Sequence, residues 1–216
     1  MLVSMKALLD VANEYNFAVP APNIQNELTA RGAIAAAEAC NGPLILDIAF
    51  PIHPDIPFLA EQTRKLAEQS PLPIAINLDH GGSNDRDFAP CLHDVMTCIR
   101  SGFTSVMVDR SSLPYEDNVA QVKYVVQLAH SIGVTVEAEL GHVGSGDCYD
   151  TKSDMVLTRS EDAVSYIQQT GVDCLAVSIG TAHGLYKGPP QLDFDRLAAI
   201  KKATGNFPLV LHGGSG

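Results

Sequence analysis

The fold is decided by three stretches of sequence, INLDHG (76–81), IGTAHG (179–184) and LVLHGG (209–214). In each stretch a mostly apolar run leads to a histidine, and a glycine follows at once. Such a run is typical of a strand that is buried in a parallel sheet. We therefore expect His80, His183 and His212 at the C-terminal ends of strands, which is where α/β enzymes carry their chemistry.

Three imidazoles on separate strands match the ligand set of a catalytic zinc ion. Such an ion is held by three protein side chains and keeps a fourth position for water or substrate. The pattern therefore favours a metalloenzyme.

Around these stretches the chain alternates apolar runs and helical patterns. Strands are predicted at 17–20, 44–48, 74–78, 105–108, 135–140, 174–179 and 209–211. Helices are predicted at 27–40, 56–69, 85–100, 115–131, 161–169 and 194–203, with a further one after Ser4. Seven strands at a spacing of about thirty residues favour a (β/α)8 TIM barrel, an α/β fold of typically about 250 residues. We expect one domain over residues 1–216, truncated before the eighth strand.

A doubly wound open sheet is the rival architecture, because it tolerates fewer than eight strands. Its usual glycine-rich turn after the first strand is missing, since that position reads PAPNIQN (20–26).

Composition narrows the class of protein further. The 216 residues hold 25 acidic and 14 basic side chains, a formal charge of −11 that argues against a nucleic-acid surface. No apolar run reaches the roughly 18 residues of a membrane span, and no secretory leader is recognisable. Five cysteines without a CxxC spacing indicate free thiols in a reducing compartment. We expect a cytoplasmic protein with neither a nucleic-acid nor a membrane partner.

Several carboxylates lie at or near predicted strand ends. Asp79 precedes His80, and a turn at the rim would bring both side chains to the mouth, although Asp79 could instead cap the next segment. Glu137 and Glu139 share one face of their strand, so they need a partner or a metal, and Glu139 is the better placed of the two. Asp109 could orient a ligand histidine or bind the metal itself.

Two further groups of residues suit a phosphorylated substrate. Asp147 lies on a long polar loop, where it is either a base or a solvated charge. Glycine-rich loops follow the two later histidines, and glycines let backbone amides approach an anion closely. The phosphate candidates are Gly184, Lys187, Gly213 and Ser215. The remaining histidines, His53, His93, His130 and His142, are not expected to be ligands.

Taken together, the chain resembles the class II, metal-dependent ketose-bisphosphate aldolases, which include the fructose-bisphosphate and tagatose-bisphosphate enzymes. Six motifs carry the resemblance in the family's order: VPAPNIQN (19–26), LDHG (78–81), SVMVDRS (105–111), VEAELGHVGSGD (136–147), AVSIGTAHGLYKG (176–188) and PLVLHGGSG (208–216).

The resemblance implies one catalytic Zn²⁺ on His80, His183 and His212, with Glu139 as an alternative ligand and Asp109 close by. It implies Asp79 as the acid/base at the C4 oxygen and Asp147 as the base at the ketose carbon. The four phosphate candidates would hold dihydroxyacetone phosphate, and Asn23 would contact substrate. A monovalent cation near the phosphate and a homodimer or homotetramer are also expected.

Some positions depart from the family's usual pattern. Pro22 replaces a common Phe, LILDIAF (44–50) replaces a strand that often holds Gln and Ser, and Arg110 and Ser112 replace a frequent Gly and His. Asp147 is one methylene shorter than the usual Glu. An aldolase for another ketose phosphate, and an inactive fragment that binds metal or sugar phosphate, therefore stay open. A zinc amidohydrolase is disfavoured, since its HxH pair on the first strand is missing.

Overall fold

The structure is a computed structural model that describes residues 1–82, 87–148 and 155–214. Its helices and strands alternate along the chain, and every strand pairing with a given register is parallel. Two compact units divide the chain: Met1–Asp109 with Tyr124–Glu137, and Arg110–Lys123 with Ala138–Gly216. Helix α5 (Tyr115–His130) and strand β4 (Thr135–Leu140) have residues in both units.

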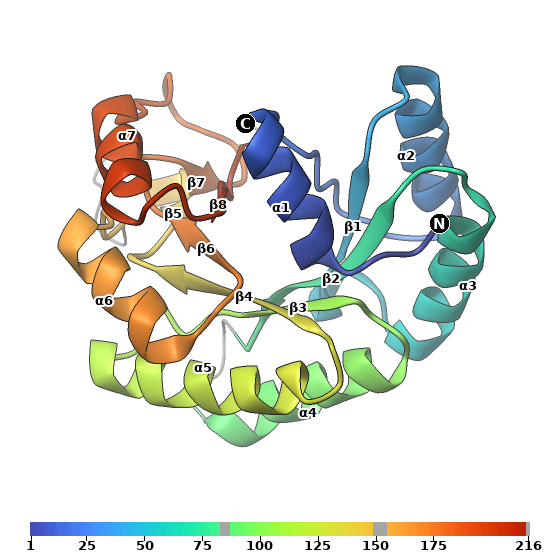
Figure 1. The fold of residues 1–216 in the computed structure, drawn as a ribbon, viewed down its shortest axis with the longest axis horizontal. Coiled ribbons are helices and arrows are strands. Elements are labelled where there is room, and N and C mark those ends of the chain that lie inside the picture. Colours follow the sequence, from blue (N-terminus) through green and yellow to red (C-terminus); the bar gives the residue numbers. More distant parts are fainter. Residues whose placement is uncertain (83–86, 149–154, 215–216) are drawn as a thin grey trace. The chain divides into compact units, whose positions relative to one another are not determined.

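The first unit contains three further parallel strands in chain order. They are β1 (Leu44–Ile48), β2 (Ile74–Gly81) and β3 (Ser105–Val108). Its helices are α1 (Met5–Tyr15), α2 (Glu27–Cys40), α3 (Ile56–Gln69) and α4 (Phe88–Arg100), with a 3-10 turn at Phe50–Ile52. Figure 1 shows α2 and α3 side by side along β1 and β2, with which they pack.

Local signals explain where the helices of this unit begin and end. Asn26 and Thr29 form a capping box that satisfies backbone donors at the start of α2. Asn41 ends that helix in the left-handed conformation, at φ 50°. The Asp55 carboxylate accepts from the Phe58 N–H at 3.0 Å and caps α3.

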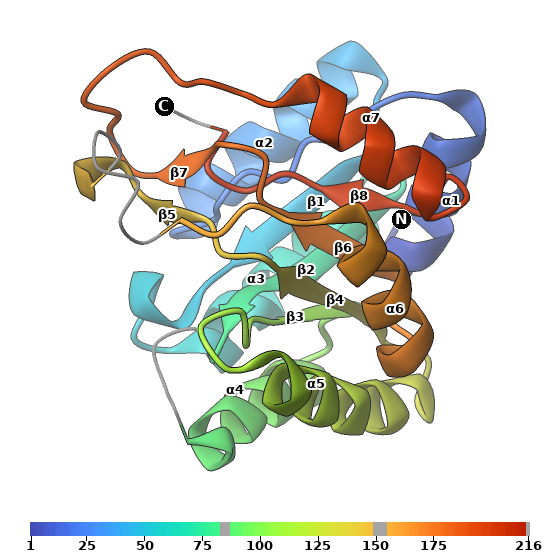
Figure 2. The ribbon, with the colours of Figure 1, turned by 90° about the vertical axis from the view of Figure 1, so that its left-hand side faces the viewer.

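The second unit is built around β6 and β8 and around a separate ribbon of two short strands. Its strands are β5 (Gly144–Ser145), β6 (Cys174–Val177), β7 (Ala182–His183) and β8 (Leu209–Val210). Its helices are α6 (Ser160–Thr170) and α7 (Phe194–Ala203), with a 3-10 turn at Gly146–Cys148. Strand β6 pairs with β8, and β5 pairs with β7. Helices α6 and α7 pack against each other, as Figure 2 shows.

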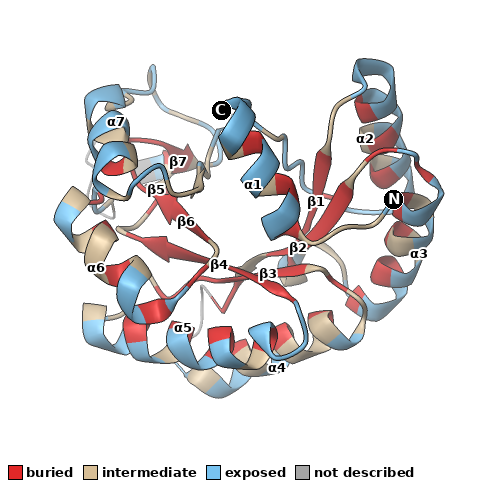
Figure 3. Cartoon of the chain, viewed as in Figure 1, coloured by how far each residue is buried: buried red, intermediate tan, exposed pale blue. Residues whose placement is uncertain are grey.

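Most predicted elements are confirmed. Strands β1, β3 and β4 have the predicted bounds, while β6 and β8 are shorter than expected. All residues of β1, β3, β4 and β6 are buried, whereas the helices expose one face, as Figure 3 shows. Among the described residues, no helix is long and apolar enough to cross a membrane.

The strand predicted at 17–20 is wrong. The segment instead runs beside β1, where the Pro20 and Pro22 carbonyls accept from Ile45 and Asp47 N–H groups at 3.1 Å each. Proline has no N–H to return, so a regular ladder cannot form there. Within the described residues, the one bridge to β1 comes just after this segment, between Asn23 and Asp47.

Candidate functional site

Strand β2 contains a bulge where its candidate residues lie. Leu78 pairs with Val106 and Gly81 pairs with Val108, so Asp79 and His80 together face one residue of β3. His80 has a φ of 47°, a left-handed backbone conformation that is uncommon for residues other than glycine. The extra residue changes the alternation of side chains. It explains how neighbours in sequence both reach the same end of the strand.

The bulge brings His80 against two carboxylates. His80 Nδ1 lies 2.9 Å from Asp109 Oδ2, and His80 Nε2 lies 3.7 Å from Asp79 Oδ1. The Asp109 N–H donates to the Gly81 carbonyl at 3.0 Å, which fixes the backbone beneath the pair. An aspartate on one ring nitrogen sets the tautomer of a histidine and leaves the other nitrogen for a ligand.

Asn23 joins this group through its amide. Asn23 Nδ2 donates to Asp79 Oδ2 at 2.6 Å. The Ile24 N–H donates to the Asp47 carbonyl at 2.7 Å, and Ile24 is buried, so the loop before α2 is anchored to β1. The first unit therefore brings together four predicted site residues: Asn23, Asp79, His80 and Asp109.

In the second unit His183 and His212 lie next to each other. Their ring centroids are 6.1 Å apart and the ring planes are tilted by 53°. Two imidazoles on one tetrahedral zinc ion, at Zn–N distances of about 2.1 Å, have centroids roughly 5.2 Å apart. The two rings are therefore neighbours, but they lie farther apart than a shared tetrahedral ion requires.

Tyr186, which sequence reasoning missed, connects the chain around these histidines. Its hydroxyl accepts from the Ala182 N–H and donates to the Gly213 carbonyl, each at 2.8 Å. Gly213 has a φ of 71°, and a Cβ there would lie 2.5 Å from the Ala182 carbonyl oxygen. Only glycine allows this approach. The signal available in the sequence was a tyrosine three residues after His183, but a single tyrosine does not indicate which backbone groups it bonds.

Glu139, the penultimate residue of β4, is a buried carboxylate. Glu139 Oε1 accepts from the Val143 N–H at 3.0 Å and lies 3.8 Å from His142 Nδ1. That ring nitrogen is also 2.9 Å from Ser111 Oγ. His142 was not expected near the chemistry, and its contact with Glu139 could not be read from the sequence. Glu137 lies two residues before Glu139 on β4, and its carboxylate accepts from Asn77 Nδ2 at 3.3 Å. This bond gives the buried carboxylate a hydrogen-bond partner.

The remaining candidates are exposed or lie outside the described residues. Asp147 is exposed on the 3-10 turn after β5, where its N–H donates to Ser145 Oγ at 3.3 Å. Ser145 is the register partner of His183. Gly184 and Lys187 are exposed, and Ser215 lies outside the described residues.

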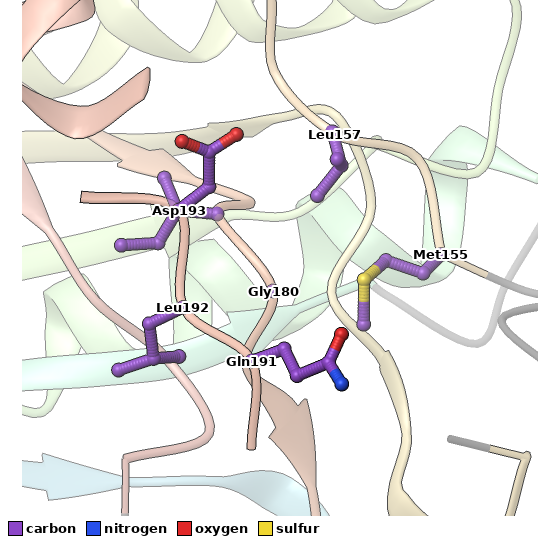
Figure 4. A pocket seen from close by; sticks show the side chains of 7 residues that line it. Met155, Leu157, Gly180, Gln191, Leu192 and Asp193 are labelled. Carbon is purple, nitrogen blue, oxygen red and sulfur yellow. The ribbon is translucent and has the colours of Figure 1, made fainter. Parts of the chain in front are cut away.

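A separate pocket of about 470 Å³ lies in the second unit, and Figure 4 shows the residues that line it. It is lined by Met155, Leu157, Ile179, Gly180, Gln191, Leu192 and Asp193. Asp193 caps α7 and pairs with Arg196, whose backbone N–H and guanidinium hold the pKa of the Asp193 carboxyl below its usual value. Asp193 is the one charged residue that lines the pocket, and its carboxylate is already bonded to Arg196. None of the predicted site residues lines the pocket.

The predicted ligands are divided between the two units: His80 is in the first, and His183, His212 and Glu139 are in the second. Each unit groups its own members as described. Coordination of one ion by all three histidines stays a prediction.

Comparisons with known proteins agree on one family. The family model described as fructose-bisphosphate aldolase class-II matches residues 3–216. A Bacillus subtilis (strain 168) protein described as "Probable fructose-bisphosphate aldolase" is 39% identical over 220 residues, which cover 100% of this chain and 74% of that protein.

Solved structures give the same result for the fold. The YdjI aldolase from Escherichia coli K12 matches with a TM-score of 0.83 at 29% identity, covering 100% of this chain and 74% of that one. The fructose-bisphosphate aldolase of Campylobacter jejuni matches with a TM-score of 0.78 over 99% of this chain and 71% of that one. At 23% identity, the second likeness shows the fold alone. The predicted α/β fold class is confirmed.

Proposed function

Because the chain belongs to the class-II fructose-bisphosphate aldolase family, and is therefore a carbon–carbon lyase, we propose that it cleaves a ketose 1,6-bisphosphate. The substrate is of the fructose or tagatose type, and the products are dihydroxyacetone phosphate and an aldehyde. The observation that carries this proposal is the pairing of His80 with Asp109 at the bulge beside Asp79.

We propose zinc as the metal, held by His80, His183 and His212, with Glu139 as an alternative ligand and Asp109 close by. The donor set supports this choice, because neutral imidazoles and carboxylates are the ligands of catalytic zinc. The Asp109 carboxylate supports it too, since it lies 2.9 Å from Nδ1 of His80 and would orient that ring as a metal ligand. When bound, zinc supplies a Lewis acid that polarises the substrate carbonyl and stabilises negative charge on its oxygen.

The two aspartates divide the proton transfers. Asp79 holds the proton that moves to and from the C4 oxygen, and the amide of Asn23, at 2.6 Å from its carboxylate, orients it and contacts substrate. Asp147 removes the proton from the ketose carbon in the condensation direction. No lysine Schiff base is needed for this division of roles.

We propose that Gly184, Lys187, Gly213 and Ser215 bind the phosphate of dihydroxyacetone phosphate. Gly184 and Gly213 have φ values of 84° and 71°, a conformation that lets successive backbone N–H groups face one anion. Lys187 is exposed and adds a positive charge to the same loop. We also propose a monovalent cation near this phosphate, a homodimer or homotetramer, and a cytoplasmic location.

Proton exchange tests the reaction without knowledge of the aldehyde. Zinc-loaded protein is incubated with dihydroxyacetone phosphate in deuterated water, and loss of one C3 proton is followed by NMR. Exchange without added aldehyde is the expected result. Exchange only with another ketone phosphate would transfer the proposal to a different substrate. No exchange with any ketone phosphate, despite bound zinc, would refute the proposed chemistry.

A further inference from the structure

The segment that leaves β4 and carries Asp147 is tied at both of its stems. The outgoing stem is residues 140–142 and the returning stem is residues 156–158. The His142 N–H donates to the Val156 carbonyl at 2.7 Å, and the Val156 N–H donates back to the His142 carbonyl at 3.1 Å. This pair of bonds is an isolated antiparallel bridge inside a unit whose registered strand pairings are parallel.

Thr158 fixes the returning stem by using every polar group that it has. Its hydroxyl donates to the Leu140 carbonyl and accepts from the Ser178 N–H at 2.8 Å. Its own N–H donates to the Ser178 carbonyl at 3.0 Å, and its carbonyl accepts from Arg196 Nη1 at 2.8 Å. Thr158 is only 1% exposed, so water cannot replace any of these bonds.

Ser178 and Gly141 complete the connection between the two stems. Ser178 Oγ donates to the His142 carbonyl at 3.1 Å, so this residue binds both stems from the end of β6. Gly141 has a φ of 85°, and a Cβ there would lie 2.5 Å from the Val156 carbonyl oxygen and 2.7 Å from Thr158 Oγ1. The stems therefore pack too closely for any other residue at position 141.

We infer that Thr158 is a positioning residue for the reaction, because its hydroxyl sets where the segment bearing Asp147 leaves and rejoins the fold. The inference rests on the proposed function, in which Asp147 is the base. Proton transfer requires the base within hydrogen-bond reach of the carbon-bound proton, and small errors in such placement cost orders of magnitude in rate. The Thr158 hydroxyl bonds to the Leu140 carbonyl and to the Ser178 N–H, so in this proposal it acts on the rate through the position of Asp147.

The test compares three threonine variants in the zinc-loaded full chain. Thr158→Val removes the hydroxyl but keeps the shape, and Thr158→Ser keeps the hydroxyl. Thr170→Val is the matched control, because Thr170 is also buried and its hydroxyl donates to the Tyr166 carbonyl at 2.7 Å within α6. The readouts are kcat and KM for proton exchange of dihydroxyacetone phosphate, and amide hydrogen exchange at His142 and Val156.

We expect Thr158→Val to lower kcat at least tenfold with KM within threefold, and to speed amide exchange at Val156 at least tenfold. Thr158→Ser should restore both, and Thr170→Val should change neither. A Thr158→Val protein with the kcat of the control would overturn the inference alone. Absence of proton exchange in the unmodified protein would overturn the proposed function, and the inference with it.

If Thr158→Val does not fold, Ser178→Ala replaces it. This variant keeps the backbone bonds to Thr158 and loses only the bond to the His142 carbonyl. A threefold or larger fall in kcat at unchanged KM supports the inference. A kcat equal to that of the unmodified protein contradicts it.

Discussion

His80 and Asp109 form a carboxylate–imidazole pair across two neighbouring strands, with Nδ1 and Oδ2 2.9 Å apart. Both groups are largely shielded from water, with side-chain exposures of 19% and 5%. The bulge in β2 allows this pair, because it places His80 beside Asp109, the residue that follows β3. Such a carboxylate fixes the orientation of a ligand histidine and raises its basicity.

Replacement of this carboxylate should weaken metal binding without unfolding the protein. We expect Asp109→Asn to lower zinc affinity by about 10- to 100-fold, as loss of a partner of a ligand histidine does. Competition with a coloured chelator measures the affinity. Asp10→Asn is the control, because Asp10 forms only an exposed ion pair with Lys6. Equal zinc affinities of the two variants would contradict the role given to Asp109.

The bulge itself should depend on glycine at position 81. A Cβ there would lie 2.7 Å from both Leu78 Cδ2 and the Met107 carbonyl oxygen. We expect Gly81→Ala to lower the free energy of unfolding by about 1–3 kcal/mol, the usual cost of overpacking. Gly32→Ala, where no atom is within 4 Å on the exposed side of α2, should instead stabilise by about 0.5–1 kcal/mol. Urea denaturation distinguishes the two, and a Gly81→Ala protein as stable as the unmodified chain would be evidence against this packing.

The strands and the bulge show how much of the fold could be predicted from the sequence. Strands β1, β3 and β4 were predictable to the residue, because buried parallel strands are continuous apolar runs. The bulge was not, since one extra residue leaves no trace in hydrophobic periodicity. The pairing of β5 with β7 could not be predicted either, because strands of two residues are too short to show a hydrophobic period.

Candidate site residues were predictable where they follow an apolar run, as His80 and Asp109 do. Contacts that depend on distant segments were not. The approach of Ser111 to His142 joins residues 31 positions apart, and Tyr186 reaches Gly213 across 27 positions. A single sequence has no pattern that marks such pairs.

Gly146 should be needed to place Asp147. A Cβ at position 146 would collide with the Leu185 carbonyl group and lie 3.1 Å from the His183 carbonyl oxygen. We expect Gly146→Ala to push the turn that bears Asp147 away from β7 and to lower the rate of proton exchange at least tenfold. Gly42→Ala, which meets no atom within 4 Å, is the control. Equal exchange rates in the two variants would argue against this placement.

The cysteines should differ sharply in reactivity. Burial raises the pKa of the Cys98 thiol far above its usual value, so the reactive thiolate is scarce, whereas Cys40 is exposed. We expect iodoacetamide at pH 8 to label Cys40 at least 100-fold faster than Cys98, as measured by peptide mass spectrometry over time. Addition of urea should remove the difference. Similar rates in the folded protein would contradict the burial of α4 against β2 and β3.

Diffraction data collected at the zinc absorption edge from a zinc-loaded crystal test the central claim most directly. The account predicts one strong anomalous peak, bonded at about 2.1 Å to a ring nitrogen of each of His80, His183 and His212. A zinc peak bonded to other residues, or to only one of these three histidines, would contradict it.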